Sequence, residues 1–326
     1  MNRIAVIGGG AWGTALAQVA AKAGREVLLW AMEDEVVDAV NASSENPMFL
    51  PGIALDPAIR ATARLDEISD CDAWLVVTPA QNMRSVLERA PRCDLPRMLC
   101  SKGIEEHSGE LLHKVAAEAC PGAPIAVLSG PTFAHEVARG LPTAVTLAAE
   151  DRSVGERLRA ALAQPAFRIY GSDDVAGAEI GGAVKNVLAI ACGVVEGRGL
   201  GQNARAALIA RGFAEMTRFG VAMGARPETL AGLSGLGDLV LTCSSTSSRN
   251  YSLGKGIGEG RSASELMADR RTVAEGAFTA PALARIAKTR GIDMPIVDAV
   301  HSLLKGAAVE SVVEQLLARP PKSEGV

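Results

Sequence analysis

A glycine-rich turn joins the first predicted strand of this chain to its first predicted helix. A short apolar strand leads into the sequence GGGAWG at residues 8–13, and an alanine-rich helix is expected over residues 14–23. The glycines follow the spacing G-x-G-x-x-G between a strand and a helix, the context in which this pattern binds a dinucleotide. Gly8 would permit the tight turn, Gly10 would let the backbone approach a pyrophosphate, and Gly13 would let helix and strand pack closely. The alternative is a purely structural glycine turn.

The order of the apolar segments predicts the fold class. Short runs rich in β-branched residues alternate with helical stretches through the first half, which is typical of a parallel sheet covered on both faces. We therefore expect an α/β fold with a Rossmann-like, doubly wound, mostly parallel sheet. Strands are predicted over residues 3–7, 26–30, 73–78, 97–101, 125–129, 144–148 and 167–170.

No strand is predicted after Tyr170, and the second half is expected to be all-helical. Its first helix would cover residues 175–195, with an interruption at Gly181-Gly182, and Pro227, Pro281 and Pro295 would mark helix entries or breaks. The expected domains are a dinucleotide-binding domain over 1–185 and a helical substrate-binding domain over 186–326. Further helices are predicted over residues 204–223, 262–268, 280–288 and 296–305.

The composition disfavours several classes of function. A formal charge of −4 and only 3% aromatic residues argue against nucleic-acid binding by charge or stacking. No uninterrupted apolar run approaches the roughly 20 residues of a membrane span, and the N-terminus lacks a signal-peptide pattern. No metal site is expected, because the six cysteines show no paired spacing, and free thiols in a reducing cytoplasm are the simplest interpretation. These cysteines are Cys71, Cys93, Cys100, Cys120, Cys192 and Cys243.

The end of the second predicted strand bears on the choice between NAD and NADP. Glu33 follows it, and an acidic side chain at this place usually binds the adenosine ribose hydroxyls of NAD, whereas a nearby arginine accommodates the phosphate of NADP. Capping of the next helix by Glu33 or Asp34 is the alternative. The sequence favours NAD without deciding between the two cofactors.

Two lysines are candidates for chemistry. Lys185 lies in an apolar helical stretch, where burial would lower the pKa of its ammonium and suit it to proton transfer, unless its stem reaches the surface. Lys102 follows the fourth predicted strand, and ligands of open α/β sheets bind beyond the carboxyl ends of the strands. The turn after the next strand contains Gly130 and Thr132, which could expose backbone N–H groups and a hydroxyl there, or could serve simple turn chemistry.

A polar run near residue 249 is the candidate anion site. Arg249 lies among hydroxyl residues at an expected helix start, and a guanidinium matches the oxygens of a phosphate. A solvated loop is the alternative for this segment.

Taken together, these segments resemble the bacterial NAD(P)-dependent glycerol-3-phosphate dehydrogenase family over nearly the whole chain. The sequences GPTFA, GGAVKN and GLGDL, at residues 130–134, 181–186 and 235–239, are specific and occur in the family's order. The resemblance implies reduction of dihydroxyacetone phosphate to sn-glycerol 3-phosphate for phospholipid synthesis, with NAD or NADP as cofactor.

The resemblance also implies roles for individual residues. Lys185 would exchange the proton at the substrate C2 oxygen, and Lys102 would polarise that oxygen. The implied substrate-binding residues are Lys102, Gly130, Thr132, Lys185, Asp238, Ser248, Arg249 and Asn250. The implied cofactor-binding residues are Gly8, Gly10, Ala11, Trp12, Gly13, Glu33, Lys102, Ala134, Arg249, Val273 and Glu275.

Two positions depart from the family pattern. Ala11 stands where members often have serine, so one contact to the pyrophosphate is in doubt, and Met32 stands where many have histidine or arginine, which puts NADP preference in doubt. The alternatives are a ketopantoate reductase-like enzyme and a dinucleotide-sensing protein without turnover. A homodimer is a family-level expectation.

Overall fold

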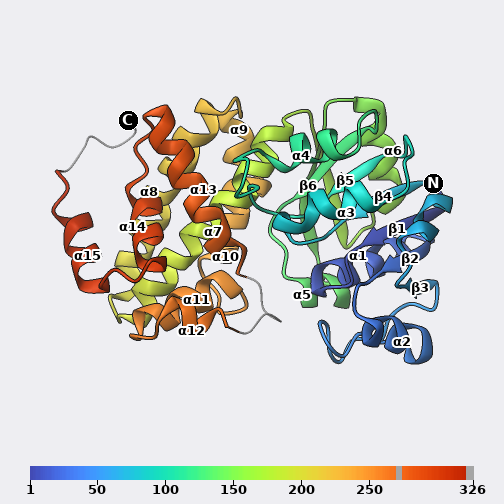
Figure 1. Cartoon of the computed structure of the whole chain (residues 1–326), viewed down its shortest axis with the longest axis horizontal. Helices are drawn as coiled ribbons and strands as arrows, with labels where there is room; N and C mark the ends of the chain where they lie inside the picture. Colours follow the sequence, from blue (N-terminus) through green and yellow to red (C-terminus); the bar gives the residue numbers. More distant parts are fainter. Residues whose placement is uncertain (269–273, 321–326) are drawn as a thin grey trace.

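The computed structural model describes residues 1–268 and 274–320. An α/β half contains the N-terminus and a helical half contains the C-terminus, and α7 (Val175–Gly197) lies where the two meet (Figure 1). The last strand ends at Ser172, so the chain passes from one half to the other within a few residues.

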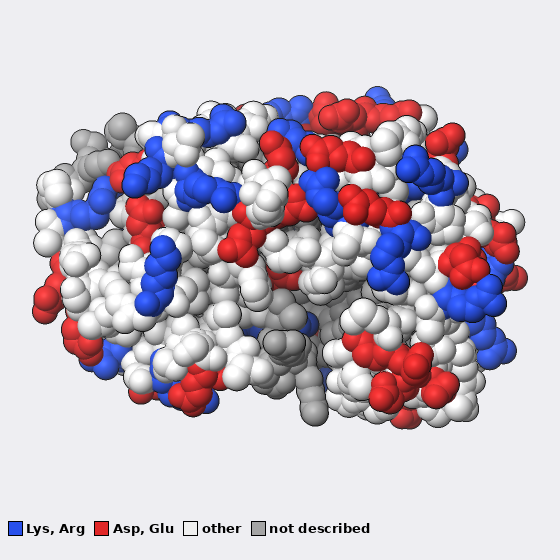
Figure 2. All heavy atoms as spheres, viewed as in Figure 1, with Lys and Arg blue, Asp and Glu red and all other residues white. Residues whose placement is uncertain are grey.

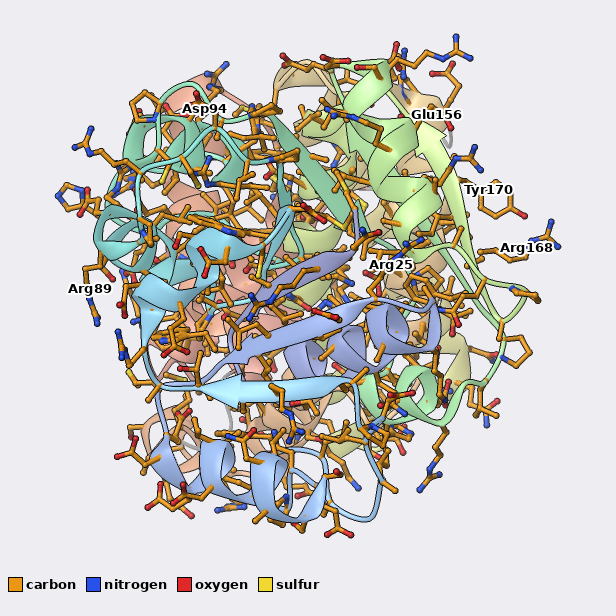
Figure 3. The ribbon with its side chains drawn as sticks, turned by 90° about the vertical axis from the view of Figure 1, so that its right-hand side faces the viewer. Arg25, Arg89, Asp94, Glu156, Arg168 and Tyr170 are labelled. Atoms are coloured by element: carbon orange, nitrogen blue, oxygen red, sulfur yellow. The ribbon has the colours of Figure 1, made fainter. Side chains whose placement is uncertain are left out.

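The α/β half is built on one eight-stranded sheet with the strand order β3-β2-β1-β4-β5-β6-β7-β8. Neighbouring strands are parallel except β6 and β7, which are antiparallel, so the predicted doubly wound, mostly parallel sheet is confirmed. Figure 3 shows β3 and α2 at one end of the sheet and β8, with its labelled Arg168 and Tyr170, at the other. The strands are β1 (Arg3–Ile7), β2 (Glu26–Trp30), β3 (Ile59–Thr62), β4 (Ala73–Val76), β5 (Arg97–Leu99), β6 (Ile125–Ser129), β7 (Thr143–Ala149) and β8 (Phe167–Ser172).

Helices cover both faces of this sheet, and each face has its own apolar core. Because β1 is buried on both sides, its residues alternate between the two cores, with Val6 in one and Ile7 in the other. The helices here are α1 (Ala11–Lys22), α2 (Asp34–Ser43), α3 (Met83–Arg89), α4 (Leu112–Ala119), α5 (Ala134–Arg139) and α6 (Arg152–Leu162), with 3-10 turns η1 (Leu65–Asp70) and η2 (Ala80–Asn82).

The helical half packs around α7. This helix is long and apolar enough to cross a membrane by composition, but 94% of its most apolar window is buried inside the protein, as befits a core helix. The other elements of this half are α8 (Gly201–Ala222), α9 (Pro227–Leu230), the π-turn η3 (Leu233–Gly237), α10 (Asp238–Thr242), α11 (Arg249–Gly258), α12 (Ala263–Leu266), α13 (Glu275–Arg290), α14 (Pro295–Leu304) and α15 (Val309–Leu317).

Two expectations about these elements were wrong, and one strand was not predicted. The sequence analysis did not predict β3, a four-residue strand that pairs with β2. Helix α7 is continuous through Gly181-Gly182. Groups of neighbouring segments occupy the space that side chains at these two positions would fill, and this packing supports the helix there. Pro281 lies inside α13 and marks neither an entry nor a break, whereas Pro227 and Pro295 do begin helices.

Candidate active site

In the glycine turn after β1, two glycines have no room for a side chain, and a third faces open space. Gly8 has φ +126°, and a Cβ there would lie 2.9 Å from the Val77 carbonyl oxygen. A Cβ on Gly13 would lie 1.8 Å from the Gly8 oxygen, whereas one on Gly10 would meet nothing within 4 Å. Gly10 precedes α1 without capping it by a side chain, so the first N–H groups of the helix face an open space that suits a pyrophosphate.

The carboxyl ends of β5 and β6 lie beside this turn. The Trp12 indole, at the start of α1, donates a hydrogen bond to the Cys100 carbonyl oxygen at 3.2 Å. Lys102 lies two residues further along, and its ammonium donates to the Gly130 carbonyl oxygen at 2.9 Å. The Thr132 hydroxyl donates to the same oxygen at 3.3 Å. The structure therefore brings together predicted residues from three segments of the α/β half.

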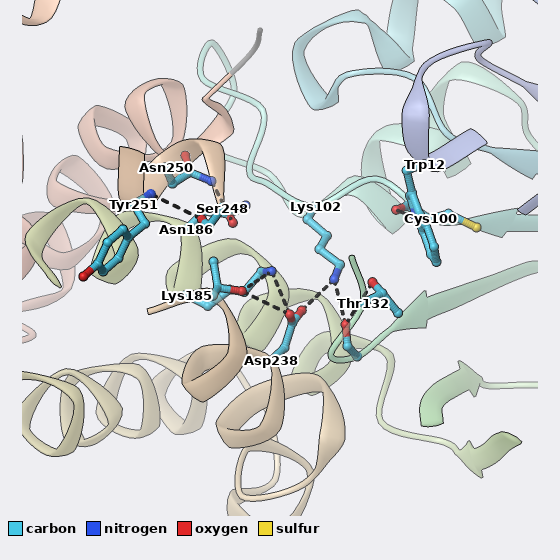
Figure 4. Close-up of polar contacts among 12 residues, drawn as sticks. Trp12, Cys100, Lys102, Thr132, Lys185, Asn186, Asp238, Ser248, Asn250 and Tyr251 are labelled. Atoms are coloured by element: carbon cyan, nitrogen blue, oxygen red, sulfur yellow. Dashed lines mark hydrogen bonds and ion pairs between the residues drawn. The ribbon is translucent and has the colours of Figure 1, made fainter. Parts of the chain in front are cut away.

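Asp238 joins Lys102 to Lys185 (Figure 4). Its carboxylate is fully buried, and one oxygen lies 2.6 Å from the Lys102 ammonium while the other lies 2.7 Å from the Lys185 ammonium. The Lys185 ammonium also donates to the Thr242 hydroxyl at 2.8 Å. The expectation that Lys185 is buried is confirmed, since its side chain is 7% exposed and its stem does not reach the surface.

Burial sets the ionisation of Lys185. Removal from water lowers the pKa of the ammonium from 10.5 to about 8, and the positive charge of Lys102 acts in the same direction. The Asp238 carboxylate opposes this shift by stabilising the charged form. A lysine that titrates near neutral pH can both donate and accept a proton, which is the property expected of a general acid–base group.

Glycines allow these elements to approach each other. A Cβ on Gly181 of α7 would lie 2.4 Å from the Ser234 carbonyl oxygen in η3, the turn that leads directly into Asp238. A Cβ on Gly182 would lie 3.0 Å from the Ser129 hydroxyl and 3.3 Å from the Lys102 stem. The close approach at this glycine pair is therefore made by the backbone of η3 and by a lysine side chain.

The predicted anion site lies at the start of α11. The Ser248 hydroxyl caps this helix by accepting from the Tyr251 N–H at 3.2 Å. The Asn250 side chain is buried, donates to the Asn186 side chain at 3.0 Å and accepts from the Gly276 N–H at 2.8 Å. Arg249 is exposed and next to them. Here Ser248 and Asn250 hold the local structure, and the exposed guanidinium is the group left to meet an anion.

The remaining predicted cofactor residues lie on both sides of the space between the halves. Ala11 and Ala134 begin α1 and α5. Glu275 begins α13 and accepts from the Ala80 N–H at 3.3 Å, and burial raises the pKa of its carboxyl to about 7. Val273 falls outside the described residues.

Glu33 occupies the N-cap position of α2 but makes no side-chain cap hydrogen bond. Capping by its carboxylate, the alternative considered for this residue, is therefore wrong. Asp34 is the first residue of the helix, one position beyond the cap.

Two site residues were missed by the sequence analysis. Thr242 contacts Lys185 and lies one helical turn after Asp238, a spacing that could have indicated a shared face. Asn186 follows Lys185, and its side chain accepts a hydrogen bond from Asn250. The two residues are 64 positions apart, so no local sequence pattern predicts this contact. Within residues 1–268 and 274–320, no group of His, Cys, Asp or Glu residues forms a metal site.

A cavity of about 620 Å³ lies elsewhere, where Arg25, Asp94 and Arg157 contribute to its walls. Figure 3 labels Arg25 and Asp94 on that side of the α/β half. None of the predicted site residues lines it. The lysine cluster is therefore the better candidate for chemistry, because it combines buried charge with the open glycine turn.

Comparison with known proteins agrees with this geometry. The family profile described as "NAD-dependent glycerol-3-phosphate dehydrogenase N-terminus" matches residues 3–155, and the corresponding C-terminus profile matches residues 174–314. The glycerol-3-phosphate dehydrogenase [NAD(P)+] of Erythrobacter litoralis is 65% identical over 98% of this chain and 97% of its own length. The chain belongs to the NAD-dependent glycerol-3-phosphate dehydrogenase family. Membership confirms the predicted family and the predicted NAD(P)-dependent oxidoreductase.

Solved structures extend the comparison. The Coxiella burnetii glycerol-3-phosphate dehydrogenase is 38% identical, covers 98% of this chain and 99% of its own, and superposes with a TM-score of 0.93. A ketopantoate reductase from Ralstonia eutropha covers 97% of this chain and 99% of its own with a TM-score of 0.59, but only 16% identity. The second likeness shows a shared fold alone, so it does not support the ketopantoate alternative.

Proposed function

We propose that this chain catalyses reversible hydride transfer between NAD(P)H and dihydroxyacetone phosphate, giving sn-glycerol 3-phosphate for glycerophospholipid synthesis. The observation that carries the proposal is the buried cluster in which Lys102 and Lys185 share the Asp238 carboxylate beside the glycine turn. Family membership supports the same reaction.

The lysines have separate roles in this proposal. A bound nicotinamide supplies or accepts the hydride. During reduction, Lys185 donates a proton to the C2 oxygen as negative charge develops on it, and Lys102 stabilises that charge. In the reverse direction neutral Lys185 accepts the proton of the C2 hydroxyl. Asp238 positions both ammonium groups and is not itself required to change protonation.

The substrate phosphate provides the orienting contact. The exposed Arg249 guanidinium binds it, with Asn250 beside it. Contacts of Ser248 and Asp238 with the hydroxyl groups of the glycerol moiety are carried over from the family resemblance, and both side chains are buried in the described structure. Gly130 and Thr132 line the pocket beyond β6. Binding energy from a remote phosphate favours the reactive orientation of the carbonyl.

The cofactor is assigned to the first half of the chain. Residues 1–185 would form the dinucleotide-binding domain and residues 186–326 the substrate-binding domain. The proposed contacts are Gly8, Gly10, Ala11, Trp12, Gly13, Glu33, Lys102 and Ala134, with Arg249, Val273 and Glu275 from the helical half. The open space at Gly10 and the uncapped start of α1 support this placement.

We also propose a cytoplasmic location and a homodimer. The six cysteines are all free thiols in the described structure, as suits a reducing compartment. The homodimer is carried over from the family resemblance, and gel filtration with light scattering would test it by giving the mass in solution.

The test of the proposed function is an absorbance assay of the reduced nicotinamide band with dihydroxyacetone phosphate. We expect turnover with this substrate and none with ketopantoate. Lys185→Ala should lower kcat by at least about 100-fold while cofactor binding persists. Cofactor binding without turnover of the triose phosphate would favour a dinucleotide-sensing protein, and near-normal turnover of Lys185→Ala would remove this residue from the mechanism.

A further inference from the structure

The segment that follows α2 places one buried side chain against the glycine turn. Asn46 lies three residues after this helix and is fully buried. Its side-chain amide donates one hydrogen bond to the Gly9 carbonyl oxygen at 2.8 Å and another to the Thr14 hydroxyl at 2.8 Å. The Phe49 N–H donates to the amide oxygen at 3.1 Å, which fixes the NH2 group towards the turn. Asn46 therefore joins the segment after α2 to the start of α1.

The Gly9 carbonyl oxygen is held from two sides. Besides Asn46, the Thr14 hydroxyl donates to it at 3.3 Å. A trans peptide is planar, and its C=O and N–H groups point in opposite directions. Because the Gly9 carbonyl points into the protein, the Gly10 N–H points outward, and a Cβ on Gly10 would meet nothing within 4 Å. No acceptor within residues 1–268 and 274–320 takes this N–H, so it is available to an anion.

Hydrogen bonds are needed to fix this peptide because side chains cannot do so. Residues 8–10 are three successive glycines, whose backbone rotates with little steric restriction. In the opposite orientation, the Gly9–Gly10 peptide would present its carbonyl oxygen to a bound phosphate and repel it. The bonds from Asn46 and Thr14 thus select the orientation in which an N–H group faces the anion.

The segment that carries Asn46 is also anchored by other contacts. Ser44 ends α2 with φ +53°, a left-handed conformation that is strained for a residue other than glycine. The Leu55 N–H donates to the Ser44 carbonyl oxygen at 2.8 Å. The Asp56 N–H donates to the Gln18 side chain of α1 at 2.8 Å. Removal of the Asn46 side chain should therefore loosen the turn without releasing the whole segment.

The charged groups of this region face the solvent, whereas the buried amide is neutral. Figure 2 shows acidic side chains gathered at the lower right, where Figure 1 places α2. A neutral donor holds the Gly9 carbonyl without adding a charge close to a bound pyrophosphate, whereas a carboxylate at position 46 would repel both. The exposed acidic residues of this segment are Asp34, Glu35, Asp38 and Glu45.

We propose that Asn46, together with Thr14, is a positioning residue that holds the glycine turn in the orientation that binds the pyrophosphate of a dinucleotide. This inference rests on the proposed placement of the cofactor at the turn. Both side chains are fully buried, so they do not touch the cofactor and act through the Gly9–Gly10 peptide. Their loss should lower the affinity for any ligand that carries the pyrophosphate, whether or not a nicotinamide is attached.

The test is calorimetric titration of the full chain with NADH and with ADP-ribose, which keeps the pyrophosphate and lacks the nicotinamide. Asn46→Ala should raise both Kd values at least about tenfold, by factors that agree within about twofold. In the absorbance assay its KM for NADH should rise by more than its kcat falls. A merely structural role would lower the free energy of unfolding and leave both Kd values unchanged.

Two substitutions of Thr14 test the same peptide from its other side. Thr14→Val keeps the volume and removes the hydroxyl, so it should raise both Kd values at least about threefold. Thr14→Ser keeps the hydroxyl and should stay within about twofold of the original chain. This pair carries the test if Asn46→Ala does not fold.

Asn41→Ala is the matched control for Asn46→Ala. The Asn41 amide also makes two hydrogen bonds to backbone, with the N–H and C=O groups of Ala61 at 2.9 Å each, and neither bond involves the turn. Its removal should leave both Kd values within about twofold of the original.

An affinity for NADH that stays within about twofold of the original in Asn46→Ala or in Thr14→Val would overturn the proposal. A loss for NADH that ADP-ribose does not share would also overturn it, because the effect would then lie away from the pyrophosphate. If the variants lose affinity for both ligands but the original chain does not turn over dihydroxyacetone phosphate, the inference stands and only the proposed reaction is contradicted.

Discussion

At the scale of single residues, Asp238 balances the charge of the site. One fully buried carboxylate serves two ammonium groups, at 2.6 and 2.7 Å, so the cluster retains a net positive charge. Such a charge is costly in a protein interior unless something anionic completes it. The oxygen of a ketone that is being reduced is such a group, and the excess charge is therefore placed to favour the transition state.

The titration of Lys185 predicts that kcat/KM changes with pH in opposite senses for ketone reduction and for alcohol oxidation. Reduction needs the ammonium, so kcat/KM for dihydroxyacetone phosphate should be constant below the Lys185 pKa of about 8 and fall above it. Oxidation of glycerol 3-phosphate needs the neutral amine, so its kcat/KM should rise through the same pH and then level off. Initial rates in both directions check this, and the second ionisation of the phosphate, near pH 6, lies well below the window.

Asp238→Asn provides a readout that distinguishes this charge effect from loss of structure. Since the carboxylate raises the pKa of Lys185, its removal should move both limbs to lower pH and reduce turnover at least about tenfold. Thr242→Val is the control, because it removes an uncharged contact to the same ammonium. Limbs that stay in place in Asp238→Asn would show that this carboxylate does not set the charge state of Lys185.

Arg249→Ala should act on substrate binding. The exposed guanidinium makes no hydrogen bond in the described structure, so its removal leaves no buried group unpaired and should not alter folding. Loss of a charge-assisted contact to phosphate should lower kcat/KM at least about tenfold. Arg261→Ala, which removes another exposed arginine of the same half, is the control. Unchanged kcat/KM in Arg249→Ala would contradict the phosphate assignment.

At the scale of elements, local sequence patterns correctly predicted most of the strands and the glycine turn. The turn at residues 8–13 and seven of the eight strands follow from apolar runs and glycine spacing. The strand β3 was not predicted, because Ile59-Arg60-Ala61-Thr62 is short and interrupted by an exposed arginine. The cluster around Asp238 could be assigned residues by resemblance, but not geometry, because its contacts join positions 53 and 136 residues apart.

The glycine at position 181 should be essential for the meeting of α7 and η3. In Gly181→Ala the new Cβ would press on the Ser234 carbonyl, so we expect about 2 kcal/mol less stability and a lower kcat, since η3 leads into Asp238. Gly171→Ala, whose Cβ would meet nothing within 4 Å, is the control and should change stability by less than about 0.5 kcal/mol. Denaturant unfolding and the absorbance assay measure both effects. Equal stability of the two variants would show that α7 and η3 can separate without consequence.

At the scale of the whole molecule, α7 is tied to the α/β half away from the lysine cluster as well. Glu179, on this helix, accepts from the His113 N–H at 2.8 Å and lies 2.6 Å from the His113 ring nitrogen. His113 belongs to α4, which packs under the sheet. Lys185 follows Glu179 on the same helix by six residues, so this pair helps to fix the position of the catalytic lysine relative to the sheet.

Stability conferred by this pair should fall as pH rises. Burial lowers the pKa of His113, but its hydrogen bond and ion pair with Glu179 raise it above 6.5 on balance, and burial raises the pKa of Glu179. Both groups therefore hold protons more tightly in the folded chain than in the unfolded chain, and the free energy of unfolding declines with pH. The contribution of His113 is complete below the ordinary histidine pKa and is lost as pH rises through the raised value, and that of Glu179 is complete only below the ordinary glutamate pKa.

The double variant His113→Asn with Glu179→Gln measures this contribution. It replaces both ionisable groups, so that neither is left buried without its partner. The difference in unfolding free energy between the original chain and this variant should shrink as pH rises from about 6 to about 9. The half-exposed pair of His135 and Glu136, 3.9 Å apart, is the matched control, and the same substitutions there should change stability by less than about 0.5 kcal/mol at every pH. A difference that grew with pH would mean that the pair is held in the opposite protonation state, with Glu179 ionised and His113 neutral.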